Sequence, residues 1–308
     1  MKKVLIALLA ATFLIPSFAL AQDKIVIGLT LPSLSHPFFV YLQKNVMDEA
    51  EKLGVEVIAI DAENVAAKQM SIVEDFIAKG VKGVLMSPIG EDALVPAVEA
   101  LNEAGIPVAT VDRKVAGGDV LVHVGADNVE GGRVAARYLI EKLGGKGNVL
   151  ELEGTPGASP AIDRKAGFDE VIATSEIKIL VSQTAQFERA RGQSVMENLL
   201  QVHKDFQGVF AANDEMILGS AEAMSAAGVD LSKVVTIGYD AIPDALSYIK
   251  DGKLSATIEQ FPGEQAKQSL RLLVEYIKDG KEPPSKEVYI TPVAITLDNL
   301  DQAEHKVE

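Results

Sequence analysis

Short runs rich in β-branched residues alternate along the chain with longer amphipathic stretches. In the first amphipathic stretch, Phe39, Leu42 and Val46 recur at helical spacing, and Gly54 then provides a stop. In chain order the segments are IVIGLT, the helical stretch 38–53, VEVIAI, the stretch 66–79, GVLMS, the stretch 92–104 and PVATV. This alternation is typical of βαβ units and predicts an α/β fold built around a parallel sheet.

The same pattern resumes after Asn128. A helical stretch at residues 133–143 is followed by NVLELE, a helix, IKILVSQ, a helix, GVFAA, a helix and VVTIGY. Residues 83–112 (GVLMS, helix, NEAG, PVATVD) parallel residues 208–240 (GVFAA, helix, SAAG, VVTIGYD). This internal similarity predicts two lobes of like topology that bring their strand ends to a common cleft. We expect short hinge segments between them, because no low-complexity linker is present.

Polar side chains follow several of the predicted strands. Asp112-Arg113 come after IPVATV, Asn213-Asp214 after GVFAA, Asp240 after VVTIGY, and Gln260 after SATIE. In an open parallel sheet, ligands bind outside the carboxyl ends of the strands. The repetition therefore predicts a shared site for a small polyhydroxylated molecule, with Asp112 and Asp240 facing it from opposite sides.

Phe38 and Phe39 directly follow His36-Pro37, which places them in the first turn of a helix with Pro37 at its first position. The chain has no Trp and only 5% aromatic residues, so a Phe pair at the carboxyl end of a strand is conspicuous. Two interpretations stay open for the pair. The rings form a wall that stacks on the C–H face of a sugar, or they belong to the ordinary core.

Asp112 and Arg113 are the most informative pair. A carboxylate accepts and a guanidinium donates in planar geometry, so one side chain can bridge neighbouring hydroxyls of a sugar ring. Burial of these charges requires pairing with each other or with Arg164 and Asp240, and we favour this over a solvated surface ion pair. The arginines should lower the pKa of Asp112 and Asp240, which suits hydrogen-bond acceptance better than general acid catalysis of glycoside hydrolysis.

Asn213 and Asp214 open a predicted helix. We expect Asp214 to cap this helix while Asn213 points into the cleft. Arg164, Phe187 and Gln260 are weak candidates singly, because Arg and Gln are usually solvated and a single Phe usually lies in the core. They become informative only together with the other candidate residues at the predicted strand ends.

Composition and motifs exclude several function classes. The sequence has no Cys, which excludes disulfides and thiolate metal sites. It contains no HExxH, P-loop, GxSxG or GxGxxG motif, and His36, His123, His203 and His305 lack metal-ligand spacing. We therefore expect no cofactor, no metal and no catalytic residue. The formal net charge of −15 disfavours nucleic acid and anionic membranes as partners.

The first 21 residues have the features of a cleaved secretory signal peptide. Lys2 and Lys3 precede an apolar run that ends at Ile15, and small residues continue to Ala21. The run is too short to span a membrane. We expect a mature periplasmic protein that begins near Gln22, with a net charge of −17, because the leader removes two lysines and no acidic residue. No cysteine that could carry a lipid follows the signal peptide, which favours a freely soluble protein over a lipid-anchored one.

A set of longer runs identifies a family. The runs HPFFVYLQ, VDR at Asp112-Arg113, ADNVEGG, DRKAGF, VMENLL, VFAANDEM, GYDAIPDA and DGKLSATIEQ occur in this order. With them the chain closely resembles the periplasmic sugar-binding proteins of the ribose-binding type, from residue 24 to about residue 296. The resemblance implies the type I periplasmic binding protein fold, in which two Rossmann-like lobes with parallel sheets are joined by three hinge crossovers and close on the ligand.

The resemblance also implies a site and a division of the chain. Phe38 and Phe39 would stack on one face of the sugar and Phe187 on the other. Its hydroxyls would be bound by Asp112, Arg113, Arg164, Asn213, Asp240 and Gln260. The expected division is a signal peptide at 1–21, an N-terminal lobe at 22–126 plus 261–289, and a C-terminal lobe at 127–260 plus 290–308.

The resemblance further implies the solute-binding component of an ABC sugar importer. The expected state is a monomer, the expected partners are a monosaccharide and an inner-membrane permease, and a chemoreceptor is a further candidate.

One position departs from the family pattern, because ribose binders of this type carry Asn where this chain has His36. Imidazole is bulkier than a carboxamide and, when neutral, presents one donor and one acceptor. The expected ligand is therefore ribose or a closely related pentose or ketohexose. Two alternatives stay open, a receptor for a polyol or a furanose-like signal such as autoinducer-2 and a secreted carbohydrate-modifying enzyme. The effector domains of LacI-type repressors share the fold, but they follow a helix-turn-helix, and in this chain an export signal takes that place.

Overall fold

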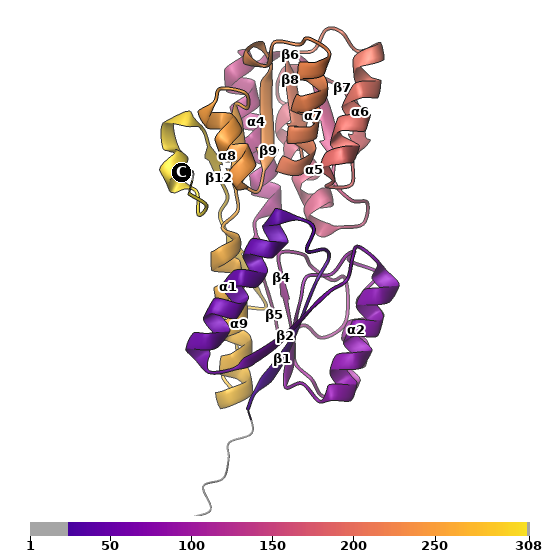
Figure 1. The fold of residues 1–308 in the computed structure, drawn as a ribbon, viewed down its shortest axis with the longest axis vertical. Coiled ribbons are helices and arrows are strands. Elements are labelled where there is room, and N and C mark those ends of the chain that lie inside the picture. Colours follow the sequence, from indigo (N-terminus) through magenta and orange to yellow (C-terminus); the bar gives the residue numbers. More distant parts are fainter. Residues whose placement is uncertain (1–23, 307–308) are drawn as a thin grey trace, which may run out of the picture.

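Two six-stranded sheets form the framework of the protein, whose computed structural model describes residues 24–306 (Figure 1). The strand order is β11-β5-β4-β3-β1-β2 in one sheet and β12-β10-β9-β8-β6-β7 in the other. The strand order is the same in both sheets when β1 to β5 are matched with β6 to β10, and β11 with β12. The predicted α/β fold with two lobes of like topology is confirmed, whereas the predicted signal peptide lies outside the described residues.

The N-terminal lobe contains the first sheet, whose strands all pair in parallel. Its strands are β1 (Val26–Leu31), β2 (Glu56–Asp61), β3 (Gly83–Met86), β4 (Val108–Val111), β5 (Val122–Ala126) and β11 (Glu287–Ile290). Its helices are α1 (Pro37–Leu53), α2 (Ala66–Lys79), α3 (Val95–Glu103) and α9 (Pro262–Asp279).

The C-terminal lobe contains the second sheet, in which only β12 runs antiparallel to its neighbour β10. Its strands are β6 (Lys146–Glu153), β7 (Glu176–Thr184), β8 (Gly208–Ala211), β9 (Val235–Tyr239), β10 (Ala256–Glu259) and β12 (Val293–Ile295). Its helices are α4 (Asn128–Leu143), α5 (Ser159–Ile172), α6 (Arg189–Val202), α7 (Asp214–Ala226) and α8 (Pro243–Lys250), with the short helices η1 (Leu231–Lys233) and η2 (Leu297–Gln302).

Helices cover both faces of each sheet, which explains why the central strands are apolar almost throughout. In the N-terminal lobe, Leu29 and Leu85 belong to the core under α1 and α9, whereas Val84 and Met86 belong to the core under α2 and α3. None of the helices in residues 24–306 is both long and apolar enough to cross a membrane.

Helix α4 begins five residues before the stretch that periodicity predicts. The side chain of Asp127 caps it by accepting a hydrogen bond from the backbone N–H of Glu130 at 2.9 Å. Gly132 in its first turns disfavours a helix locally, but a Cβ there would lie 2.1 Å from the carbonyl oxygen of Arg164. The glycine is therefore needed for the close contact between α4 and α5, which its propensity alone does not reveal.

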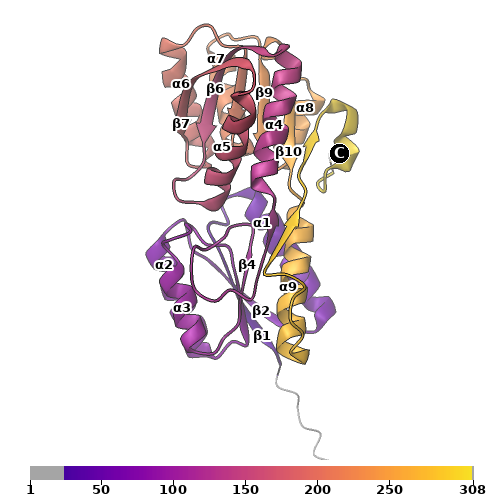
Figure 2. The same cartoon turned by 180° about the vertical axis from the view of Figure 1, so that it is seen from behind.

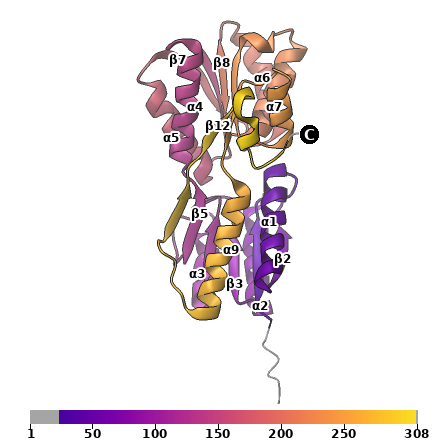
Figure 3. The same ribbon diagram turned by 90° about the vertical axis from the view of Figure 1, so that its left-hand side faces the viewer.

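The chain passes between the two sheets at three places. These are between β5 and α4, between β10 and α9, and between β11 and β12. Figures 2 and 3 show the segment from β11 to β12 running from one lobe to the other beside the start of α9. Because all three connections are short, the lobes can move relative to each other mainly by rotation about this hinge region.

The C-terminal segment, residues 303–306, makes a further contact between the lobes. The Glu304 carboxylate accepts hydrogen bonds from the backbone N–H groups of Gly263 and the residue after it, at 2.6 and 3.1 Å, in the first turn of α9. The Glu304 N–H donates to Glu259 Oε2 at 2.9 Å. The ring of His305 lies 4.0 Å from the ring of Tyr41 on α1, centroid to centroid. The chain end is thus bound to both lobes.

Candidate ligand-binding site

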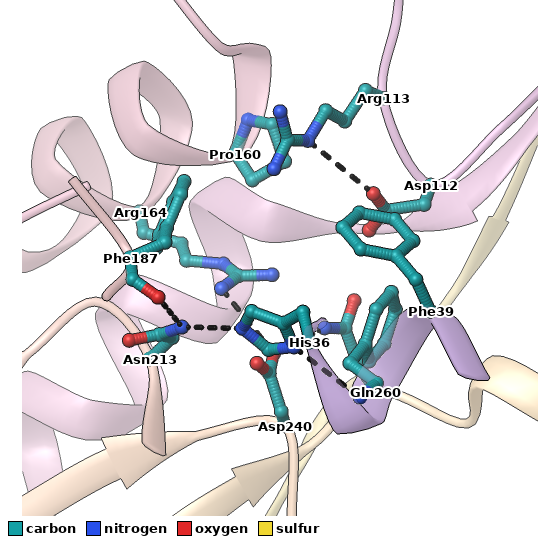
Figure 4. A pocket seen from close by; sticks show the side chains of 11 residues that line it. His36, Phe39, Asp112, Arg113, Pro160, Arg164, Phe187, Asn213, Asp240 and Gln260 are labelled. Atoms are coloured by element: carbon teal, nitrogen blue, oxygen red, sulfur yellow. Dashed lines mark hydrogen bonds and ion pairs between the residues drawn. The ribbon is translucent and has the colours of Figure 1, made fainter. Parts of the chain in front are cut away.

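A pocket lies between the lobes at the carboxyl ends of both sheets, with about 240 Å³ of empty space that includes its opening to solvent (Figure 4). The lining residues are His36, Phe38, Phe39, Asp112, Arg113, Pro160, Arg164, Phe187, Asn213, Asp240 and Gln260. The structure thus brings all ten predicted residues together around one pocket. Pro160 was missed, although it precedes Arg164 by four residues and therefore shares its face of α5.

The three predicted phenylalanines line the pocket and also belong to the cores of their lobes. The rings of Phe38 and Phe39 meet edge to face, with centroids 5.1 Å apart. Phe187 comes from the other lobe, and the guanidinium carbon of Arg113 lies 5.3 Å from the ring centre of Phe39 and 5.6 Å from that of Phe187. The Phe pair therefore belongs to the core and also forms part of the pocket wall, whereas its stacking on a sugar stays a prediction.

Asp112 and Arg113 are buried, as expected, and not a solvated surface pair. Arg113 Nε lies 3.6 Å from Asp112 Oδ2, and the same carboxylate oxygen accepts a hydrogen bond from Ser87 Oγ at 3.2 Å. The backbone of Asp112 has a positive φ of 64°, which turns the side chain into the cleft at a cost in strain. Within the described part of the chain, the buried Arg113 Nε has no hydrogen-bond partner.

Arg164 is held by groups of its own lobe. Its Nε donates to Asn128 Oδ1 at 2.8 Å, its Nη1 donates to the Ala212 carbonyl at 2.6 Å, and the same nitrogen lies 3.5 Å from Asp240 Oδ1. Its guanidinium carbon lies 3.5 Å from the ring centre of Tyr239. Asn128 and Tyr239 were not predicted from the sequence as supports of Arg164, although both lie in runs that carry the family resemblance.

Asp240 and Gln260 extend the polar wall. Gln260 Nε2 donates to Asp240 Oδ1 at 2.5 Å. The expectation that the arginines lower the pKa of the two aspartates is wrong. Burial raises the pKa of Asp240 to about 7 and also raises that of Asp112, and the attraction of Arg164 only partly offsets this effect. Desolvation outweighs the arginine charges in this closed pocket.

The roles predicted for Asn213 and Asp214 are exchanged in part. Asn213, not Asp214, caps α7, because its Oδ1 accepts from the Met216 N–H at 3.0 Å while its Nδ2 reaches the cleft. Asp214 is buried within its lobe, where its carboxylate accepts from the Thr257 hydroxyl at 2.7 Å and the Ile242 N–H at 2.9 Å. Its pKa is raised by burial. Asp214 therefore supports the sheet and does not line the pocket.

His36 caps α1 at the edge of the pocket. Its Nδ1 accepts from the Phe38 N–H at 3.2 Å, and its Nε2 lies 2.8 Å from Asn213 Nδ2 in the other lobe. Burial, assisted by Arg113 and Arg164, lowers the pKa of His36 to about 3, so the ring is neutral at physiological pH.

The pocket combines balanced charges with apolar walls. Two arginines and two aspartates line it, and amides and the neutral His36 supply further donors and acceptors. In residues 24–306, no group of three or more acidic or histidine side chains is arranged to hold a metal ion. Such a site is suited to hydrogen-bonding a small neutral molecule between flat apolar faces.

Comparisons with known proteins agree with this geometry. Residues 27–282 match the periplasmic binding protein domain. The chain is 46% identical over 247 residues to the ribose import binding protein RbsB of Bacillus subtilis, covering 80% of each chain, and 39% identical over 283 residues to that of Escherichia coli, covering 91% of this chain and 94% of the other. A Caulobacter myo-inositol binding protein, solved with myo-inositol bound, superimposes with a TM-score of 0.87 at 38% identity, covering 91% of this chain and 96% of that one.

Proposed function

The chain belongs to the periplasmic binding protein domain family, and from this premise we propose that it is the sugar-binding component of an ABC importer. It holds a monosaccharide, D-ribose or a closely related pentose or ketohexose, in the pocket between its lobes. The names of the ribose import relatives support this assignment.

One observation carries the proposal: hydrogen-bonding groups from both lobes converge on a single pocket. Asp112 and Arg113 come from one lobe, and Arg164 and Asp240 from the other. Each guanidinium donates in a plane and each carboxylate accepts, which matches vicinal hydroxyls of a sugar. Because two carboxyl groups share the pocket with the two guanidiniums, a sugar phosphate or a sugar acid is disfavoured at pH values at which both aspartates are ionised.

We further propose that binding closes the two lobes about the hinge. The proposed rigid bodies are residues 22–126 plus 261–289 and residues 127–260 plus 290–308. The crossings of the chain after β5 and after β10 support the first two limits, whereas β11 extends the N-terminal sheet to Ile290. A ligand that contacts both lobes binds the closed state better and therefore shifts the population toward it. An inner-membrane permease that recognises the closed lobe surfaces would then distinguish loaded from empty protein.

The proposed setting is the periplasm, after removal of residues 1–21. The proposed protein is a monomer, and a chemoreceptor is a further candidate partner. We propose no catalytic role, since the relatives named above are binding proteins of transport systems. Release of product from sugar glycosides by the purified protein would contradict this part of the proposal.

The test is ligand screening of the mature protein, beginning at Gln22, by thermal shift and calorimetry. The panel contains D-ribose, D-allose, D-fructose, L-arabinose and myo-inositol, with ribose 5-phosphate and gluconate as charged comparators. We expect a neutral sugar to bind with a micromolar Kd or tighter, about −8 kcal/mol or better. A hundredfold excess over Kd should add about 2.7 kcal/mol of stability. The absence of heat and of stabilisation with every neutral member would refute the proposal.

A polyol is the second candidate ligand. The likeness to a protein solved with myo-inositol bound favours it, and the pocket chemistry does not require a ring oxygen. Binding of myo-inositol at least tenfold tighter than every monosaccharide would replace the sugar by a polyol in the proposal. A furanose-like signal such as autoinducer-2 remains a further alternative and can be added to the same panel.

A further inference from the structure

His36 contacts both lobes at once (Figure 4). Its Nδ1 accepts the Phe38 backbone N–H at 3.2 Å, and its Nε2 lies 2.8 Å from Asn213 Nδ2 across the cleft. Both ring nitrogens of one imidazole therefore face an N–H group.

The neutral ring can accept a hydrogen bond from only one of these two groups, the Phe38 N–H or the Asn213 Nδ2–H. A neutral imidazole has one acceptor nitrogen and one N–H. The Nδ1 that accepts from Phe38 carries no proton, so the proton of the neutral ring is on Nε2. A doubly protonated ring would lose the cap of α1 and place a further cation among Arg113, Arg164 and Arg189. His36 Nε2 is therefore a donor.

The amide of Asn213 is held in one orientation. Its Oδ1 accepts from the Met216 N–H at 3.0 Å, and one hydrogen of Nδ2 is donated to the Phe187 carbonyl at 3.1 Å. A flipped amide would lose both bonds. The second hydrogen of Nδ2 points to His36 Nε2, so two N–H donors, one from each lobe, face each other.

We propose that His36 Nε2–H and Asn213 Nδ2–H donate together to a single oxygen of the ligand. This inference rests on the proposed function of the pocket and names the specificity determinant within it. A ring ether oxygen accepts in this way, as does a hydroxyl whose own proton goes to Asp112 or Asp240. A ligand without an acceptor at this place leaves both buried donors unpaired, which is costly.

The inference also predicts how the loaded cleft differs from the present one. Two N–H···O bonds of ordinary length to one oxygen place the two nitrogens roughly 4.5 to 5 Å apart. The distance between the side chains of His36 and Asn213 should therefore increase around the bound oxygen. Closure over a ligand that lacks the acceptor should remain incomplete.

The first experiment determines the tautomer of His36 by NMR of ¹⁵N-histidine-labelled protein, alone and with D-ribose. The signal is assigned by its loss in His36→Asn. We expect the neutral ring with its proton on Nε2 in both states, since Phe38 belongs to the same lobe as His36. A proton on Nδ1, or an imidazolium at neutral pH, would overturn the inference whether or not any sugar binds.

The second experiment compares variants that all retain a side chain able to cap its helix. His36→Asn keeps a donor within reach and should hold D-ribose within about fivefold of wild type. His36→Ser and Asn213→Ser keep the caps but remove the donors from the cleft, and each should weaken D-ribose about tenfold or more. Urea unfolding checks that the lobes remain intact, and His203→Asn, outside the pocket, serves as the control.

The third experiment asks whether both donors serve the same oxygen. Each Ser variant is titrated with D-ribose analogues that lack a single oxygen, including the carbocyclic analogue of the ring oxygen. The analogue that lacks the shared oxygen should bind wild type and both Ser variants with similar affinity, because it offers neither donor an acceptor. It should be the same analogue for both variants. If different analogues remove the two effects, or if His36→Ser binds D-ribose as wild type does, the inference is wrong although the pocket binds sugar. If no sugar of the panel binds, the proposed function itself fails.

Discussion

Arg164 contacts four groups within its own lobe, namely Asn128, the Ala212 carbonyl, Asp240 and the Tyr239 ring, and it also lines the pocket. Its loss should therefore affect both folding and binding, and we expect the larger effect on binding. We predict that Arg164→Ala weakens D-ribose by roughly 2 to 5 kcal/mol, because ligand oxygens and the Asp240 carboxylate lose a buried charged partner. Calorimetry measures the affinity, and urea unfolding measures the change in stability. Arg164→Lys is the matched control, since it keeps the charge but not the planar donors.

If Arg164→Ala binds within about threefold of wild type, a difference in binding free energy under roughly 0.7 kcal/mol, then Arg164 is not part of the binding site. A variant that loses more free energy of unfolding than of binding would assign the residue to the fold alone.

His123 gives the protein a pH-dependent stability. Burial, with a smaller contribution from Lys114, lowers the pKa of His123 to about 3, and its Nδ1 lies 3.0 Å from Thr110 Oγ1. Between this pKa and the unfolded value of 6.5, the unfolded chain binds a proton that the folded chain does not. The contribution of His123 to stability should therefore fall as pH decreases below about 6.5, by at most about 1.4 kcal/mol per pH unit. Buried carboxyl groups with a raised pKa, such as Asp240, contribute in the opposite direction, so the effect of His123 is read from the difference between wild type and variant.

The measurement is urea unfolding of the ligand-free protein between pH 7 and pH 4.5. His123→Gln should lose part of the acid sensitivity of wild type, and the residual slope should contain the contribution of His36. His203→Gln controls for the loss of a histidine. An unchanged pH dependence in His123→Gln would show that His123 does not titrate as described.

The chemistry of the individual site residues could be read from the sequence only in part. The polar residues after strand ends predicted which side chains meet, because the carboxyl ends of parallel strands share one edge. Their protonation could not be predicted in the same way. The pKa of Asp240 depends on how completely the two lobes exclude water from the pocket. Which of Asn213 and Asp214 caps α7 depends on the residue at which that helix begins.

At the level of elements, helix α9 depends on a residue outside it. Its N-cap position is Phe261, which has a positive φ of 58° and provides no side-chain cap. Glu304 supplies the acceptors for the first turn instead. We predict that Glu304→Ala lowers the free energy of unfolding by about 1 to 2 kcal/mol, because two N–H groups lose their acceptor.

Glu304→Gln, which keeps one acceptor oxygen, should lose less stability than Glu304→Ala in the same urea titration. Equal stability of Glu304→Ala and wild type would mean that water replaces the carboxylate at no cost.

Periodicity predicted the boundaries of α2, whose observed range of 66–79 is the expected one and which ends at the C-cap Gly80. It failed at the start of α4, where Gly132, needed for the contact with α5, looks like a helix break. Close packing between two helices is a tertiary requirement, and a single sequence shows only the local preference that it overrides.

For the whole molecule, the division of the pocket between the lobes predicts a measurable change of shape. Saturation with D-ribose should reduce the radius of gyration of the ligand-free protein in solution scattering. Lobes that are separated in solution must approach to engage the ligand, and they stop with room for one ligand oxygen between His36 and Asn213. The Arg164→Ala variant at the same sugar concentration is the control for non-specific effects. An unchanged radius and distance distribution at proven saturation would indicate a rigid, preformed pocket.

The N-terminal lobe takes two of its elements from the far end of the chain. Helix α9 and strand β11 complete it, and Leu270, Leu273 and Val274 of α9 belong to the same core as α1. During synthesis, the apolar side of α1 therefore stays uncovered until the ribosome has released residues beyond about 290. Loop closure over such a separation is slow compared with local folding. For a chain that is exported as proposed, we expect the N-terminal lobe to complete its packing only when almost the whole polypeptide has been made, which favours passage of an incompletely folded chain through a narrow translocation channel.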